Sequence, residues 1–99
     1  MQKLRNAIQD GWIVHITDHD YLDDSRDAVV ENVTSSGMTL RLSKPWTSQG
    51  RKFPTMEFSW DGDRSVEGTT VRLYHTPPRH TGKSRRLIKT FEFTPPVAR

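Results

Sequence analysis

The sequence predicts a mainly β domain: a small antiparallel β-barrel of about five or six strands, preceded by a short N-terminal helix. Three observations lead to this prediction. Apolar and polar residues alternate with period two in several short segments, turn-forming residues separate these segments, and only the N-terminal segment has a helical spacing. Because no segment could form the long helix of a parallel crossover, sequential strands are expected to be antiparallel neighbours. Closure into a barrel would remove exposed strand edges.

The first two elements follow from a change of period at Gly11. In residues 2–10 ("QKLRNAIQD"), Leu4 and Ile8 lie on one face of a short helix, and Gly11 suits the position that ends it. Over residues 12–17 ("WIVHIT") the period becomes two, which predicts the first strand. A helix this short is marginal on its own, so we expect it to pack on the sheet.

The remaining strands are predicted wherever the period-two pattern returns. They are residues 27–33, 38–43, 55–60, 69–75 and 87–94. Residues 44–54 ("KPWTSQGRKFP") contain two prolines and a glycine and predict a loop, and residues 61–68 ("DGDRSVEG") predict a turn-rich connector. The large residues expected to face inward are Trp12, Leu40, Phe58, Trp60, Leu73 and Phe91. Residues 1–94 thus form a single predicted domain, and residues 95–99 a C-terminal tail.

The segment "GWIVHITDHDYLDDSRDAVVENVTSSGMTLRLS" resembles the opening of SH3-like small barrels, in which a first strand leads through a long, often acidic loop to a hairpin. Here residues 12–17 would be the strand, 18–26 the loop and 27–43 the hairpin. The helix before the strands is similar to the Sm-type arrangement. The resemblance implies a fold but no binding residues, because the Ala-Leu-Tyr-Asp-Tyr run of signalling SH3 domains and a recognisable Sm motif are both absent.

Composition limits the cellular setting. The chain has 99 residues and no cysteine, which excludes disulfides and thiolate metal sites. The opening "MQKLRNAIQDG" lacks the apolar region of a signal peptide, and no apolar run is long enough to span a bilayer. We therefore expect a cytoplasmic protein without a membrane partner.

An acidic segment raises the question of a metal site. Residues 18–27 ("DHDYLDDSRD") hold five aspartates, whose carboxylates could ligate a hard cation. The Gly and Glu positions of an EF-hand loop are missing, so solvated turns are the expected structure. Of the four histidines, His15, His19, His75 and His80, the first two are spaced i, i+4, but on a strand and loop and not on a helix, and the sequence indicates no set of three or four converging zinc ligands. We expect no metal and no cofactor.

The sequence offers little support for catalysis. "TSSGM" lacks the glycine-flanked serine of a nucleophile elbow, and "HTGKSRR" lacks the upstream glycine of a phosphate-binding loop. We therefore expect a protein that is not an enzyme.

Charge is divided unevenly along the chain. Residues 1–36 contain three Lys/Arg and seven Asp/Glu, a net charge of −4, whereas residues 37–99 contain twelve and five, a net charge of +7. Within the basic part, residues 76–93 ("TPPRHTGKSRRLIKTFEF") carry five Lys/Arg and His80 before the first acidic residue. Such asymmetry indicates an electrostatic partner without identifying it.

The basic loop and the outward residues near it predict a binding surface for nucleic acid, whose phosphates would attract the cations while exposed aromatic rings stack on bases. The candidate residues are Arg41, Trp46, Arg51, Lys52, Arg72, Tyr74, Arg79, Lys83, Arg85, Arg86 and Lys89. An alternative is a small protein-interaction, inhibitor or adaptor module, steered to an acidic protein surface by the same charge asymmetry. A third possibility is that the basic stretch packs against residues 18–27 of its own chain.

Overall fold

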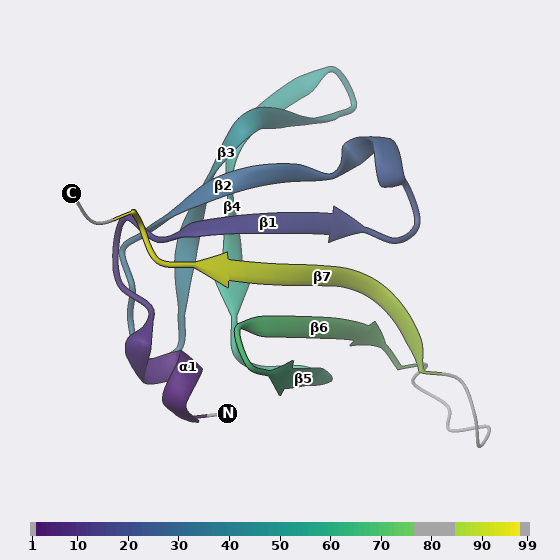
Figure 1. Cartoon of the computed structure of the whole chain (residues 1–99). Helices are drawn as coiled ribbons and strands as arrows, with labels where there is room; N and C mark the ends of the chain where they lie inside the picture. Colours follow the sequence, from purple (N-terminus) through teal and green to yellow (C-terminus); the bar gives the residue numbers. More distant parts are fainter. Residues whose placement is uncertain (1, 77–84, 98–99) are drawn as a thin grey trace.

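The structure is a computed structural model that describes residues 2–76 and 85–97. Its elements are helix α1 (Gln2–Ala7), the single 3-10 turn η1 (Leu22–Asp24), and strands β1 (Ile13–Asp18), β2 (Arg26–Glu31), β3 (Gly37–Ser48), β4 (Arg51–Ser59), β5 (Arg64–Glu67), β6 (Thr70–His75) and β7 (Arg86–Thr94). The strands form one sheet in the order β4-β3-β2-β1-β7-β6-β5 (Figure 1). Every pairing is antiparallel, which confirms the predicted mainly β class.

The sheet is open, so the predicted closed barrel is not formed. Its two outermost strands are β4 and β5, and among the described residues no backbone ladder joins them. The sheet nevertheless curls, and Figure 1 shows β3 and β4 running across β1 and β7. Phe58 of β4 lies edge-on to Phe91 and Phe93 of β7, with ring centroids 5.0 and 5.6 Å apart. Side-chain packing therefore joins the end strand β4 to the inner strand β7 across the inside of the curl. The resemblance to SH3-like barrels stays a prediction.

One face of the curled sheet forms the core, as the period-two pattern predicts. Its buried residues are Leu4, Ile8, Val14, Ile16, Ala28, Val30, Met38, Leu40, Leu42, Phe58, Val71, Phe91 and Phe93. Of the residues expected to face inward, Leu40, Phe58 and Phe91 are buried. The other three, Trp12, Trp60 and Leu73, are only partly buried and pack against the margin of this core.

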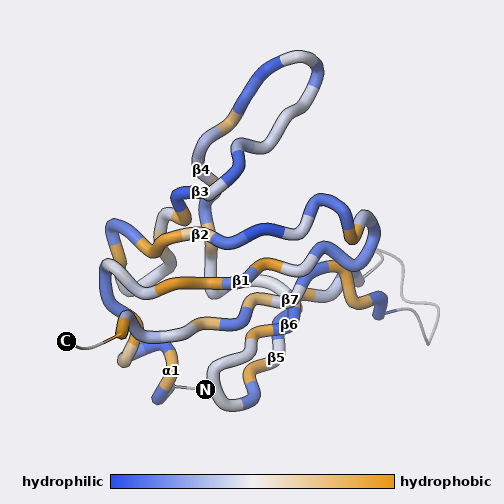
Figure 2. The backbone as a smooth tube through the Cα atoms, turned by 45° about the horizontal axis from the view of Figure 1, so that its top comes forward, coloured by the Kyte–Doolittle hydropathy of each residue, from blue (hydrophilic) through white to orange (hydrophobic). Residues whose placement is uncertain are grey.

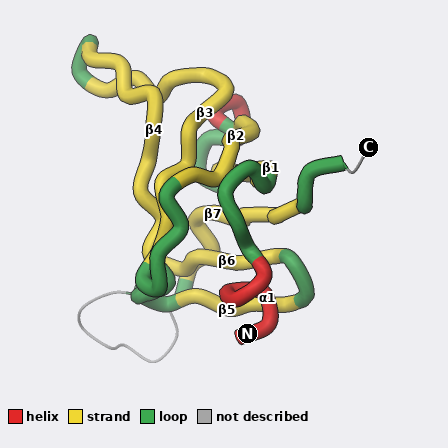
Figure 3. The backbone as a smooth tube through the Cα atoms, turned by 90° about the vertical axis from the view of Figure 1, so that its left-hand side faces the viewer, coloured by secondary structure: helices red, strands yellow, loops and turns green. Residues whose placement is uncertain are grey.

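Helix α1 covers one end of the core, as Figure 3 shows. It is shorter than the predicted span of residues 2–10, but Leu4 in the helix and Ile8 directly after it are both buried, as their spacing predicts. Gly11, predicted to end the helix, lies four residues beyond Ala7, and its φ of +95° instead suits the turn that leads into β1. Arg5 holds the helix in place by donating to the Ser35 carbonyl. Packing thus stabilises a helix too short to persist alone.

Two segments predicted as connections are strands in the structure. Residues 44–54, predicted as a loop, belong to β3 and β4 except for the two-residue turn at 49–50, and residues 61–68, predicted as a connector, contain β5. Pro45 is tolerated because the β3–β4 register shifts between Arg41 and Trp46. Pro54 is tolerated because β4 lies at the end of the sheet.

The β3–β4 hairpin turns through Gln49 and Gly50, which have φ values of 52° and 76°. A two-residue hairpin loop with positive φ at both positions is the type I′ arrangement. The outer part of this hairpin, residues 44–54, projects beyond the other strands (Figure 2). We call residues 44–54 the ribbon.

Candidate functional site

The basic segment near the C-terminus is paired with carboxylates of its own chain. Arg79, His80 and Lys83 lie outside the described residues. The remaining three cations of the predicted loop and strand form ion pairs. Arg85 pairs with Asp63 at 2.8 Å, Lys89 pairs with Asp18 at 3.5 Å, and Arg86 pairs with Asp20. Two of these carboxylates come from the acidic segment 18–27. We call residues 85–89 the paired segment.

Two of the four residues expected to widen the basic surface, Arg41 and Arg72, are also engaged. Arg41 contacts Glu31 at 2.7 Å, and Arg72 contacts Glu67 at 3.3 Å. The guanidinium carbon of Arg85 lies 3.9 Å from the centroid of the Tyr74 ring. One face of that ring is therefore already covered, which leaves less of it to stack on a base.

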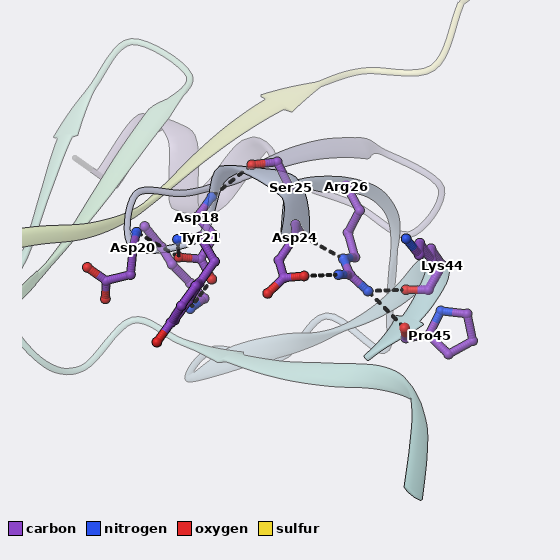
Figure 4. Close-up of polar contacts among 9 residues, drawn as sticks. Asp18, Asp20, Tyr21, Asp24, Ser25, Arg26, Lys44 and Pro45 are labelled. Carbon is purple, nitrogen blue, oxygen red and sulfur yellow. Dashed lines mark hydrogen bonds and ion pairs between the residues drawn. The ribbon is translucent and has the colours of Figure 1, made fainter. Parts of the chain in front are cut away.

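Asp18 is the most buried carboxylate of the acidic segment, with 3 % of its surface exposed. Its Oδ1 accepts the backbone N–H groups of Asp20 and Tyr21, and the backbone N–H of Asp18 donates to Ser25 (Figure 4). Burial by itself raises the pKa of Asp18, but these two N–H donors and the ammonium of Lys89 outweigh burial and lower the pKa below its ordinary value. Asp18 is thus held as a carboxylate that organises its own loop.

Two further carboxylates are stabilised in the charged form by donors around them. Hydrogen bonds from Arg85 and Thr76 lower the pKa of Asp63. The hydroxyls of Thr69 and Thr70 lower the pKa of Glu92 in the same way. Both groups are therefore structural anions within their hydrogen-bond networks.

The acidic segment does not assemble as a metal site in the part of the chain that the structure describes. Asp24 Oδ1 lies 3.6 Å from Arg26 Nη2. Asp27 Oδ1 forms a hydrogen bond of 2.6 Å with His15 Nδ1. Within residues 2–76 and 85–97, no three His, Asp or Glu side chains are grouped as metal ligands. The carboxylates instead serve turns and ion pairs.

Arg26 joins the acidic segment to the base of the ribbon. Only 8 % of its surface is exposed, and it stands at the start of β2. Nε donates to the Asp24 carbonyl at 2.7 Å, and Nη1 donates to the carbonyls of Lys44 and Pro45 at 2.7 and 2.9 Å (Figure 4). These acceptors lie where the β3–β4 register shifts, so the guanidinium satisfies carbonyls that the ladder leaves free.

The ribbon carries cations that have no carboxylate partner among the described residues. Lys44, Arg51 and Lys52 are exposed, and none forms an ion pair in the described part of the chain. No Asp or Glu occurs between Glu31 and Glu57 in the sequence. The ribbon therefore presents uncompensated positive charge, in contrast to the paired segment.

A cleft of about 450 Å3 opens where the ribbon meets the body of the sheet. It is lined by Leu42, Trp46, Ser48, Phe53, Thr55, Met56 and Lys89. Trp46 is half-buried, with the Arg26 guanidinium carbon 4.4 Å and the Lys89 ammonium 5.5 Å from its ring centroid. Phe53 has 40 % of its surface exposed. Of the two rings, Phe53 therefore presents the freer surface.

No protein-family model, curated protein or solved structure matches this chain. Across the described residues, no helix has the length and apolar character needed to cross a membrane. The site must therefore be interpreted from its own residues.

Sequence reasoning selected Arg51, Lys52 and Trp46 but missed three members of this region. Lys44 and Phe53 lie in the segment predicted as a loop, because its two prolines argue against a strand. Residues 32–56 contain no Asp or Glu, and this feature of the sequence could have indicated that cations such as Lys44 lack a nearby carboxylate. No local signal marks Arg26, because the carbonyls that it binds come from a distant strand.

Proposed function

We propose that this protein is a non-enzymatic nucleic-acid-binding module that engages its partner through the ribbon. The observation that carries the proposal is that Lys44, Arg51 and Lys52, beside aromatic side chains, have no carboxylate partner within residues 2–76 and 85–97. A phosphate chain approaching these cations displaces counterions only, whereas at Arg85 or Arg86 it must compete with a carboxylate already in place. A projecting two-stranded ribbon can also reach a partner without obstruction from the body of the sheet.

The experiment compares two triple variants that lose equal charge. One carries Lys44→Ala, Arg51→Ala and Lys52→Ala, and the other carries Arg85→Ala, Arg86→Ala and Lys89→Ala. Binding to a labelled oligonucleotide is measured by fluorescence anisotropy over a series of salt concentrations. Each phosphate contact contributes about 0.7 to the slope of log K against log salt on a single strand. The ribbon triple variant should therefore lose about 2 from the slope, and the paired-segment variant should lose less.

If the paired-segment variant retained its thermal stability but lost more of the salt slope than the ribbon variant, the interface would instead be the basic stretch around residues 79–89. Equal slopes in both variants and the wild type would contradict a phosphate-binding role for either set.

A protein partner is the second candidate, and a separate observation favours it. The outer edge of β4 is free of a strand partner among the described residues, and residues 51–54 of that edge lie on the projecting ribbon. An extended peptide could add a strand there. A pull-down from lysate with and without nuclease distinguishes the two candidates, since a strand-adding partner stays bound after nuclease treatment.

A further inference from the structure

The cleft beside the ribbon combines apolar walls with a cationic margin. Leu42, Met56 and the ring of Phe53 contribute apolar surface, and Lys89 closes one side. Its volume of about 450 Å3 falls in the range of roughly 300–1,000 Å3 that small-ligand sites occupy. A fully charged phosphate would lose its hydration against these walls, so the cleft suits an apolar or planar group.

One ring of the cleft is held rigidly and the other is accessible. Arg26 is fixed by three backbone carbonyls and in turn lies against Trp46. Lys89 is fixed by Asp18 and approaches the same ring. Phe53 has fewer constraints, with the Arg51 guanidinium carbon 5.7 Å from its ring centroid. A flat group in the cleft would contact the fixed ring of Trp46 on one side and could stack on the more accessible ring of Phe53.

Charge complementarity selects the kind of flat group. Lys89 lines the cleft, the Arg51 guanidinium carbon lies 5.7 Å from the ring centroid of Phe53, and the sequence from 32 to 56 contains no acidic residue. A planar group attached to a negatively charged chain satisfies both the apolar wall and the cationic margin. An unpaired nucleobase with its flanking phosphates has this combination of properties.

We infer that the cleft receives one unpaired base of a single-stranded nucleic acid, stacked on Phe53, while Arg51 contacts an adjacent phosphate. This inference rests on the proposed function and specifies its substrate class as single strands. In a duplex the bases are paired and stacked, so they cannot enter the cleft without being flipped out.

The test separates the base from the backbone. Affinities are measured for short oligothymidylate, for an abasic oligodeoxynucleotide of the same length, and for the corresponding duplex. Stacking on one aromatic ring supports about tenfold tighter binding of oligothymidylate over the abasic chain. Phe53→Ala should remove that tenfold difference and leave the affinity for the abasic chain unchanged. Oligouridylate in the same assay distinguishes RNA from DNA as the source of the base.

Two controls accompany the Phe53 variant. Ile13→Ala removes an apolar side chain of similar exposure, 39 %, from β1, which contributes nothing to the cleft lining. It should retain the preference for bases. Phe53→Leu keeps an apolar side chain at the site but removes the ring, and should lose most of the preference. The thermal midpoint of each variant shows that the fold is retained.

Equal affinity of the wild type for the oligothymidylate and the abasic chain would overturn the inference while leaving the proposed function standing. Tighter binding of the duplex than of the single strand would also overturn it. Absence of binding to all three oligonucleotides would overturn both.

Discussion

The ribbon and the paired segment each carry three cations, yet they differ in what those cations contact. Arg85, Arg86 and Lys89 of the paired segment face Asp63, Asp20 and Asp18. Lys44, Arg51 and Lys52 of the ribbon face no carboxylate of the described residues.

A dense run of positive charge in a sequence therefore does not by itself identify a binding surface. In the part of the chain that the structure describes, the denser basic segment is the one whose charge is already compensated. The paired cations contribute to the fold, and the unpaired ones are available to a partner.

The largest effect is expected at the inner end of β4, the strand that also forms half of the ribbon. Phe58→Ala should lower the free energy of unfolding by about 3–5 kcal/mol, because Phe58 is buried against Phe91 and Phe93. Phe53→Ala, the same substitution on the ribbon, should cost below about 0.5 kcal/mol. Denaturant unfolding followed by tryptophan fluorescence measures both. Equal losses would show that the ribbon is part of the core.

Arg26 tests the connection between the two regions. Arg26→Ala should cost about 1.5–3 kcal/mol, because the carbonyls of Asp24, Lys44 and Pro45 lose a charged donor. Arg41→Ala is the control, since this exposed arginine should contribute within about 0.5 kcal/mol. Hydrogen exchange of the ribbon amides should also accelerate in the Arg26 variant. Unchanged exchange and stability would mean that the ribbon is positioned without Arg26.

Asp18 tests the acidic side of the paired segment. Asp18→Ala should cost about 1–3 kcal/mol, because the N–H groups of Asp20 and Tyr21 lose their acceptor in a partly buried loop. Asp23→Ala removes an exposed carboxylate without an ion pair among the described residues and should cost less than about 0.5 kcal/mol. Thermal unfolding of the two variants side by side measures the difference. Similar midpoints would contradict an organising role for Asp18.

Acid should act first on the structural carboxylates of β1 and β7, because the ribbon contains no carboxylate. The pKa values of Asp18 and Glu92 are lowered in the folded protein from ordinary values of 3.8 and 4.5. Stabilisation from such groups is complete above the ordinary pKa and is lost as pH falls through the lower, folded value. Stability should therefore decline below about pH 4.5, and Asp18→Asn should flatten the decline. A denaturation midpoint independent of pH in this window would contradict the prediction.

The smallest effect is expected at the exposed pair of the paired segment. A double-mutant cycle between Asp20 and Arg86 should give a coupling energy of about 0.2–1 kcal/mol, which is typical of surface ion pairs. The same cycle between Asp20 and Lys52 should give no coupling, because Lys52 belongs to the ribbon. Coupling of Asp20 to Lys52 would remove the distinction between the two regions.

Much of the architecture follows from local pattern. Alternation in residues 12–17, 38–43 and 87–94 predicts strands that the structure contains at Ile13–Asp18, within Gly37–Ser48 and at Arg86–Thr94. Leu4 and Ile8 likewise predict a helix face that is buried. These features are predictable because strand and helix periods are properties of neighbouring residues.

The outer parts of β3 and β4 were not predicted, because their prolines and their turn residues are not typical of a β-hairpin. Pro45 and Pro54 argue against strands, but a register shift and the end position of β4 remove the hydrogen bonds that proline would break. The turn at Gln49 and Gly50 lacks the Asn-Gly or Asp-Gly pair that usually marks a type I′ loop. Their positions in the sheet, known only from the fold, decide these cases.

The sequence by itself determined the strand periods, the short helix and the number of charges of each sign. Only the tertiary structure decided which charges remain available. Lys89 and Asp18 are 71 residues apart in the chain and meet because β7 pairs with β1. Lys44, Arg51 and Lys52 belong to the ribbon of β3 and β4, which projects beyond the other strands (Figure 2). Because Coulomb attraction depends on distance in space, strand pairing and not sequence position separates compensated cations from exposed ones.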